Sequence, residues 1–322
     1  MARTRYAPDR GLTARMTLTM FLLGLVFVAF IALIIGIMTA AHVSAAAIIL
    51  VAIIFGGGSA FVSLFYSDKI ALSAARAQEV SPQEAPELHG IVDRLCALAD
   101  MDKPRVAIAP GPMMNAFATG RNSKNSVLCV TEPLLNRLEP AELEGVLAHE
   151  LSHVAHKDVQ VMTYASLLAI VAGLLVRFAF YSELFGGGGR RDSNNQNAFP
   201  VILAIMVVSA VIYAVSFLLI RLLSRYRELA ADRSGALLTG QPSALASALV
   251  KVSDQMTQIP KEDLRAAEPL NAFYFAPALN LRDPRASLAK LFSTHPSLDR
   301  RLEELEKIQH QLGQVSPGPR AL

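Results

Sequence analysis

Two apolar runs near the amino terminus constrain the fold more than any other feature of this chain. They extend from about Met16 to Met38 and from about Ser44 to Tyr66, and neither contains Lys, Arg, Asp or Glu. Each is long enough to cross a bilayer as a helix. The composition also supports membrane spans. Of the 322 residues, 52% are hydrophobic, a fraction that the core of a soluble protein does not explain. A cleaved secretory signal is the alternative for the first run, but the run is too long and a second follows almost at once. The sequence therefore predicts a transmembrane hairpin over residues 16–66.

Two further apolar runs follow in the second half of the chain. They extend from about Val161 to Tyr181 and from about Phe199 to Leu223, and each contains one arginine. They predict a second transmembrane hairpin over residues 161–223 with an outer loop at 182–198, where glycine, serine and asparagine are frequent. Long buried helices, or a hairpin that enters the bilayer only partly, remain alternatives for this pair.

Basic residues gather at one end of the four predicted spans. If all four runs cross, the ends on that side carry Arg15, Lys69, Arg76, Lys157, Arg225 and Arg227. Basic residues near span ends mark the cytoplasmic side. Both termini and the catalytic domain with residues 149–153 are therefore expected in the cytoplasm.

Overall charge and cysteine content exclude some classes of protein. The net charge is only +3, so no broad basic surface suggests nucleic-acid binding. The only cysteines, Cys96 and Cys129, lack CxxC spacing, which excludes a disulfide framework. Two buried thiols in a reducing compartment are expected.

Residues His149 to His153 read HELSH, the pattern HExxH. On a helix, residues four apart lie on one face, so His149 and His153 can bind one metal ion. Glu150 can then reach a water molecule held at an open position of that metal. These groups are what zinc-dependent peptide hydrolysis needs. The alternative is an amphipathic helix with two surface histidines.

A tetrahedral zinc site needs a third protein ligand. His156 is the nearest candidate, but three residues after His153 it is expected to point past the metal. The extended HExxHxxGxxH pattern also fails. Glu228 and Asp232 lie four apart on a predicted helix, so one carboxylate can bind zinc while the other accepts the outer N–H of a ligating histidine. By spacing alone, an exposed acidic pair balanced by neighbouring arginines remains the alternative.

The polar segments between and after the apolar runs predict short, mixed elements. Strands are expected at Arg105–Ala109, Ala116–Thr119 and Val127–Thr131, between a helix from Pro86 and the HELSH helix, which has Pro140 near its start. Further helices are expected over Pro242–Ser253 and Pro284–Gly313, separated by an irregular stretch. The predicted fold is a mainly α membrane protein with a small β-sheet and about four transmembrane helices. Its soluble parts are a basic amino terminus (1–15), a two-part catalytic domain (67–160 and 224–313) and a disordered tail (314–322).

Four motifs in order carry a family resemblance. HELSH, the apolar pair that follows it, and SRYRELAADRSGA at residues 224–236 resemble HtpX-type membrane zinc metalloproteases, which are relatives of the CAAX prenyl endopeptidases. The likeness includes NAFATG at 115–120 and STHP at 293–296, and so covers nearly the whole chain. The resemblance implies a gluzincin-like HExxH zinc metallopeptidase domain in a bacterial inner membrane, with one Zn²⁺ per chain.

The resemblance also implies residue roles. His149, His153 and Glu228 would bind zinc, Glu150 would be the general base, and Asp232 would support the site. Two weaker motifs gain roles only from the resemblance. The strand of Asn115, Ala116, Phe117 and Ala118, otherwise an ordinary edge strand, would pair with substrate backbone. His295 and Arg301, otherwise a helix-entry residue and part of a surface charge run, would stabilise the oxyanion. The remaining histidines, His42, His89 and His310, are expected at the surface or an interface.

The function expected from these features is endopeptidase cleavage of misfolded or unassembled membrane proteins, as proteolytic quality control in a stress response. The expected partners are protein substrates and the lipid bilayer, without nucleic acid, and no feature indicates an oligomeric state. Site-specific processing of the CAAX type is an alternative that more spans would favour. A non-catalytic adaptor with structural zinc is another, although structural sites usually have four protein ligands, often cysteines.

Overall fold

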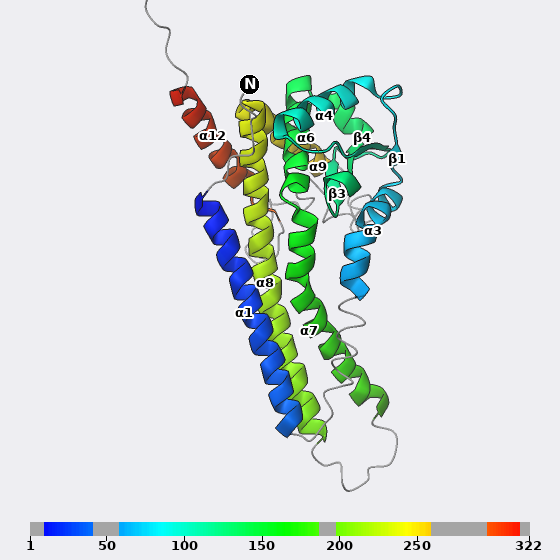
Figure 1. Ribbon diagram of the computed structural model, residues 1–322, viewed down its shortest axis with the longest axis vertical. Coiled ribbons are helices and arrows are strands. Elements are labelled where there is room, and N and C mark those ends of the chain that lie inside the picture. The colour runs from blue at the N-terminus through cyan, green and yellow to red at the C-terminus, as the bar shows by residue number, and fades with distance from the viewer. Residues whose placement is uncertain (1–9, 41–57, 187–197, 259–294, 316–322) are drawn as a thin grey trace, which may run out of the picture. The chain divides into compact units, whose positions relative to one another are not determined.

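The computed structural model describes residues 10–40, 58–186, 198–258 and 295–315. These residues form mostly helices and one small sheet, as predicted (Figure 1). The helices are α1 (Arg10–Ala40), α3 (Gly58–Ala75), α4 (Pro86–Ala99), α5 (Glu132–Arg137), α6 (Pro140–Ala155), α7 (Asp158–Gly186), α8 (Ala198–Thr239), α9 (Pro242–Gln258) and α12 (Leu298–Val315). The strands are β1 (Gln78–Glu79), β2 (Arg105–Ala109), β3 (Ala116–Gly120) and β4 (Ser126–Thr131), with a 3-10 turn, η2 (Ser123–Asn125), before β4.

Two of the described helices are long and apolar enough to cross a membrane, judged by length and composition. They cover Arg10–Ile37 and Ile202–Thr239, with mean hydropathies of 3.0 and 2.7. A span needs only about 20 residues, so the apolar first half of α8 suffices and the charged residues from Arg225 onward lie beyond it. The second predicted run falls largely outside the described residues, as do His42 and most of the outer loop. The predicted number of four spans is therefore not confirmed.

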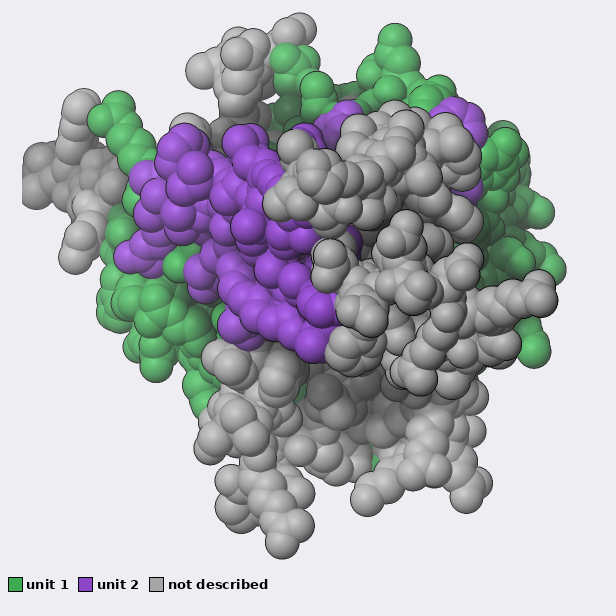
Figure 2. All heavy atoms as spheres, turned by 90° about the horizontal axis from the view of Figure 1, so that it is seen from below, with its two compact units in different colours: residues 1–13, 65–160, 224–322 green, residues 14–64, 161–223 purple. Residues whose placement is uncertain are grey.

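The chain divides into two compact units (Figure 2). Unit 1 comprises residues 1–13, 65–160 and 224–322, and unit 2 comprises residues 14–64 and 161–223. In unit 2, α1, α7 and the first part of α8 pack around buried apolar side chains that include Phe30, Ala172 and Leu223. Unit 1 contains the sheet and the HELSH motif.

The sheet of unit 1 has the strand order β1-β2-β4-β3. β2 and β4 are parallel, whereas β1 and β3 pair antiparallel with β2 and β4 respectively. All residues of β4 are buried, as expected for a strand with neighbours on both sides. In the described sheet, β3 pairs with β4 alone and is therefore an edge strand.

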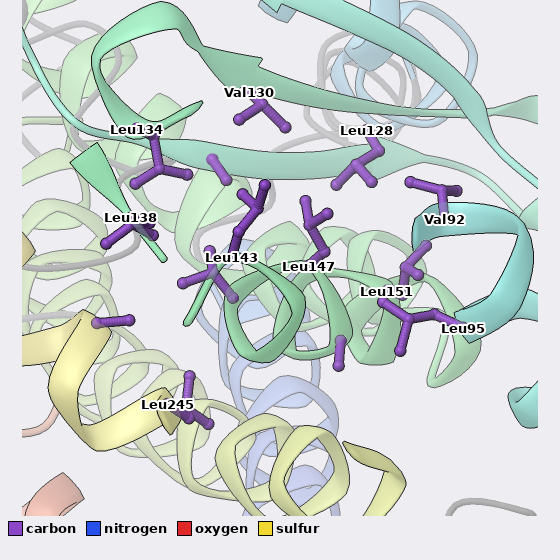
Figure 3. Close-up of a cluster of buried hydrophobic side chains, with 14 of the residues drawn as sticks. Val92, Leu95, Leu128, Val130, Leu134, Leu138, Leu143, Leu147, Leu151 and Leu245 are labelled. Carbon is purple, nitrogen blue, oxygen red and sulfur yellow. The ribbon is translucent and has the colours of Figure 1, made fainter. Parts of the chain in front are cut away.

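Alternate residues of β4 pack into two different clusters because side chains along a strand point to opposite faces. Leu128 and Val130 face the apolar stripe of α6, including Leu143 and Leu147 (Figure 3). Val127 and Cys129 belong to a second cluster that includes Ala71 of α3. The sheet is thus covered on both faces, and α6 is packed firmly against one of them.

Local contacts fix the start and the end of α6. Pro140 occupies the first turn, and Glu139 and Glu142 form a capping box in which the Glu139 N–H donates to Glu142 at 2.9 Å. Glu142 also accepts from Ser247 (2.6 Å) and Lys251 (2.8 Å) of α9. Lys157, with φ of 56°, separates α6 from α7.

The structure corrects two sequence-based expectations in unit 1. The helix expected over Pro284–Gly313 does not run through residues 295–297, and α12 begins at Leu298. Pro296 disfavours a helical His295, and the Ser297 hydroxyl caps α12 by accepting from the Arg300 N–H at 3.3 Å. The start at Pro284 itself lies outside the described residues. His89 was expected at the surface or an interface, but it is buried within unit 1, with its Nε2 3.0 Å from the Val80 carbonyl oxygen. His310, by contrast, is exposed as expected.

The two cysteines should be unreactive in the folded protein. Both are free and buried, and burial raises the pKa of the Cys96 thiol to about 11 and that of Cys129 to about 12. An ordinary thiol titrates near pH 8.5, so the thiolate fraction at pH 8 falls by on the order of 100-fold or more. We expect neither thiol to be alkylated at pH 8 until denaturant is added, when both should react. Labelling counted by intact mass spectrometry checks this, and rapid native labelling of Cys129 would contradict the packing of β4.

Candidate active site

Side chains from three helices and the backbone of one strand meet at one buried place in unit 1. α6 supplies His149, Glu150 and His153, while α8 supplies Glu228 and Asp232. The backbone of β3 approaches Glu150, and Arg301 reaches the cluster from α12. His295, just before α12, completes the set.

The three predicted metal ligands converge. Nε2 of His149 lies 3.2 Å from Nε2 of His153, and Glu228 oxygens lie 3.8 and 3.5 Å from these two nitrogens. Ligand atoms about 2.0–2.1 Å from a tetrahedral zinc ion are about 3.4 Å apart, which the observed separations bracket. Among the described residues, these three form the one group of histidine, cysteine or acidic side chains that could hold a metal ion. Two imidazoles and a carboxylate suit zinc and leave a fourth position open.

The charge around His153 also suits a cation. Burial opposes a charge on this ring, but Asp158, Glu228 and Glu150 together raise the pKa of His153 to about 9. Burial lowers the pKa of His149, so that ring is neutral at pH 7, as a metal ligand must be. The cluster therefore attracts positive charge, and a metal ion can replace the proton on His153.

A glycine lets α8 come close enough to supply Glu228 and Asp232. A Cβ atom at Gly235 would lie 2.9 Å from the backbone nitrogen of His149 and 3.2 Å from its Cα. Ala231, one turn earlier, is fully buried. Glu228 and Asp232 flank this small-residue stripe with helical spacing, which aims both carboxylates at the histidines of α6.

Asp232 and Arg301 support His149 from the side opposite the predicted metal. Asp232 lies 2.9 Å from Nδ1 of His149. Nε of Arg301 donates to Asp232 at 2.8 Å, and a terminal nitrogen donates to its other oxygen at 2.6 Å. All three side chains are at most 1% exposed. The contacts of Asp232 match the supporting role expected for it. Those of Arg301 indicate that it orients Asp232, while its predicted role at the oxyanion stays a prediction.

His153 has an equivalent support that the sequence analysis missed. Its Nδ1 lies 2.5 Å from Asp158, and Asp158 forms an ion pair with Arg227. Asp158 and Arg227 are both buried. The only signal available in the sequence was an acidic residue five positions after His153. His156, which was set aside as a ligand, lies at the end of α6 and does not belong to the metal-binding group.

Glu150 lies beside the metal ligands and under the edge strand. The Ala118 N–H donates to its carboxylate at 3.1 Å. Burial raises the pKa of Glu150 to about 8, and a nearby divalent cation would lower it again. Because backbone groups alternate along a strand, those of Ala116 and Gly120 face the same side as Ala118, away from β4.

Asn115, the first residue of the predicted substrate-binding strand, is already hydrogen-bonded to Thr131. The Asn115 carbonyl accepts from the Thr131 N–H at 2.9 Å and from its hydroxyl at 3.0 Å, so Asn115 faces β4. Phe117 is buried in the cluster on the far face of the sheet. The outward backbone groups of Ala116 and the outward carbonyl of Ala118 remain for pairing with a peptide, since the Ala118 N–H donates to Glu150.

His295 lies at the cluster as expected from the resemblance. Its Nδ1 is 3.0 Å from Glu228, the predicted third ligand. The structure thus brings Glu150, His295, Asp232 and Arg301 together around the three ligands, although they come from segments far apart in the chain.

This site and fold define an HExxH metallopeptidase in which a glutamate from a second helix lies beside the two histidines. Residues 82–309 match peptidase family M48, and the chain belongs to that family. It is 56% identical over 317 residues to Protease HtpX homolog 1 of Streptomyces coelicolor, covering 98% of this chain and 99% of that protein. It is 51% identical over 312 residues to the Protease HtpX homolog of Moorella thermoacetica, covering 96% and 98%.

A solved structure has a similar fold. The crystal structure of S. mikatae Ste24p superposes with a TM-score of 0.52 at 17% identity, covering 86% of this chain. The chain spans 62% of the length of Ste24p. Family, relatives and apolar helices together confirm the predicted HtpX-type membrane zinc metalloprotease.

Proposed function

We propose that this enzyme is a zinc endopeptidase of a bacterial inner membrane that removes misfolded or unassembled membrane proteins, with its active site and both termini in the cytoplasm. One observation carries the catalytic part: three ligand atoms within 4.8 Å of one another, with Glu150 adjoining them. The basic residues near the span ends support the orientation. The expected quality-control role rests on the resemblance to HtpX-type proteases.

His149, His153 and Glu228 would hold one zinc ion per chain. When bound, zinc polarises the scissile carbonyl and lowers the pKa of a water molecule toward neutrality. Glu150 accepts the proton of the attacking water on a carboxylate oxygen and delivers it to the leaving amine. The Ala118 N–H holds that carboxylate in place.

The substrate would be held extended along the outer edge of β3, by main-chain hydrogen bonds to Ala116 and to the carbonyl oxygen of Ala118, because the Ala118 N–H already donates to Glu150. His295, next to Glu228, would donate to the developing oxyanion. Arg301 is then a positioning residue that acts through Asp232.

Removal of the metal tests this function directly. Purified protein in detergent should contain about one zinc per chain, and casein cleavage should fall at least ~100-fold with 1,10-phenanthroline and return with added zinc, because zinc supplies the activated water. The isomer 1,7-phenanthroline, which does not chelate, is the control. Unchanged cleavage after the metal is stripped would contradict the proposal. Bound zinc without any cleavage would favour the non-catalytic adaptor.

A further inference from the structure

Each metal-ligand histidine of α6 has a carboxylate at Nδ1 and an arginine behind that carboxylate. For His149 the pair is Asp232 and Arg301, and for His153 it is Asp158 and Arg227. Asp158 lies outside every motif that indicated the function, and Arg227 lies within the motif at 224–236 but was given no role at the site.

We propose that Asp158 and Arg227 are positioning residues that hold His153 in the tautomer and orientation required for binding the metal. This inference rests on the proposed metal site. Asp158 accepts the Nδ1–H of His153 at 2.5 Å, which leaves the lone pair of Nε2 as the metal donor. That Nε2 lies 3.2 Å from its counterpart on His149 and 3.5 Å from Glu228.

Arg227 is needed because a buried carboxylate is costly without a cationic partner. Asp158 is 4% exposed and Arg227 is 8% exposed, so water replaces neither partner. The ion pair keeps Asp158 charged and facing the ring.

The course of the chain explains how Asp158 reaches back to His153. Lys157 adopts a left-handed conformation (φ of 56°), which ends α6 and starts α7 at Asp158. Arg227 comes from α8 and directly precedes Glu228. The ion pair therefore joins the first residue of α7 to the turn of α8 that supplies the third ligand, and all the residues involved belong to unit 1.

The test uses full-length protein with Asp158→Asn, Arg227→Gln or Arg227→Lys. The matched control is Arg94→Gln, which removes the arginine partner of Glu144, another carboxylate on α6, at a site away from the histidines. Zinc affinity is measured by competition with a chromophoric chelator, and ligand geometry by the visible spectrum after cobalt substitution.

We expect Asp158→Asn and Arg227→Gln to weaken zinc binding by ~10–100-fold and to change the cobalt spectrum. Arg227→Lys should restore part of the loss, and Arg94→Gln should match the unsubstituted protein. Native zinc affinity and spectrum in both Asp158→Asn and Arg227→Gln would overturn the inference while leaving the proposed function intact. An unsubstituted protein that binds no zinc would remove the proposed function, and this inference with it. If Asp158→Asn does not fold, the Arg227 variants decide: rescue by lysine supports the inference, and native affinity of Arg227→Gln refutes it.

Discussion

Replacing Glu150 by glutamine should stop peptide hydrolysis and leave the zinc in place. Glutamine has nearly the same shape and can still accept the Ala118 N–H, but it cannot take a proton from water. General-base catalysis contributes about 10²–10⁴-fold, so the turnover number on casein should fall by at least ~100-fold. Zinc content should stay near that of the unsubstituted protein, because Glu150 is not one of the three converging ligands. Casein kinetics and elemental analysis on the same preparation measure both quantities.

Glu144→Gln is the matched control for this variant. Glu144 lies on the same helix and is also buried, but its carboxylate contacts Arg94 instead of the metal-binding group. Its activity should be close to normal. Full activity of Glu150→Gln would rule out Glu150 as the base, whereas loss of zinc would show that Glu150 helps to bind it.

The same variant identifies substrates. In membranes from cells that carry Glu150→Gln, uncleaved substrates should accumulate relative to cells that carry the active chain. Accumulation of membrane proteins, measured by quantitative proteomics, would support the quality-control role. Accumulation of one processed precursor alone would favour site-specific processing.

Gly235→Ala should damage the metal site without changing any ligand. The added methyl group would lie 2.9 Å from the backbone nitrogen of His149 and 3.3 Å from the backbone carbon of Ala148. Backbone atoms in a packed helix cannot turn aside as a flexible side chain can, so α8 must shift away from α6. Overpacking of this kind costs about 1–3 kcal/mol. The shift also moves Glu228 and Asp232 away from the histidines, and zinc affinity should fall by at least on the order of 10-fold.

Gly90→Ala is the control for this substitution. Gly90 lies in α4, and a Cβ atom there would meet nothing within 4 Å. Alanine in a helix is favoured over glycine, so this variant should be equally stable or more stable by ~0.5–1 kcal/mol. Thermal unfolding and zinc titration compare the two. If Gly235→Ala keeps the zinc affinity and stability of the unsubstituted protein, the contact between α6 and α8 can accommodate a methyl group.

The parts of the site that could be predicted are those with local spacing. His149 and His153 are one helical turn apart, so their shared face follows from the period of the helix alone. Glu228 and Asp232 also share a face, but their spacing did not show which helix they approach. That depends on Gly235, whose small size matters only when α6 is known to lie against it.

Asp158 and Arg227 could not be predicted for a related reason. The reach of Asp158 back to His153 requires the left-handed Lys157, and lysine gives no signal for that conformation. The sheet shows the same limit. The short strand-like runs predicted β2 with the bounds observed and β3 and β4 to within one residue, but the central place of β4 depends on long-range pairing. β1, with two residues, is too short to produce a pattern.

Binding of substrate at the outward edge of β3 would determine which segments of a substrate are cleaved. Hydrogen bonds to main-chain N–H and C=O groups do not depend on the identity of the side chain. In a segment that is already part of a helix or sheet, these groups are already paired and cannot bind the edge of β3. If protein substrates bind at this edge, the enzyme selects segments that have lost their secondary structure and does not select a particular sequence. A membrane protein would then be cleaved where its main chain is unfolded, and a correctly folded protein of the same composition would not be cleaved.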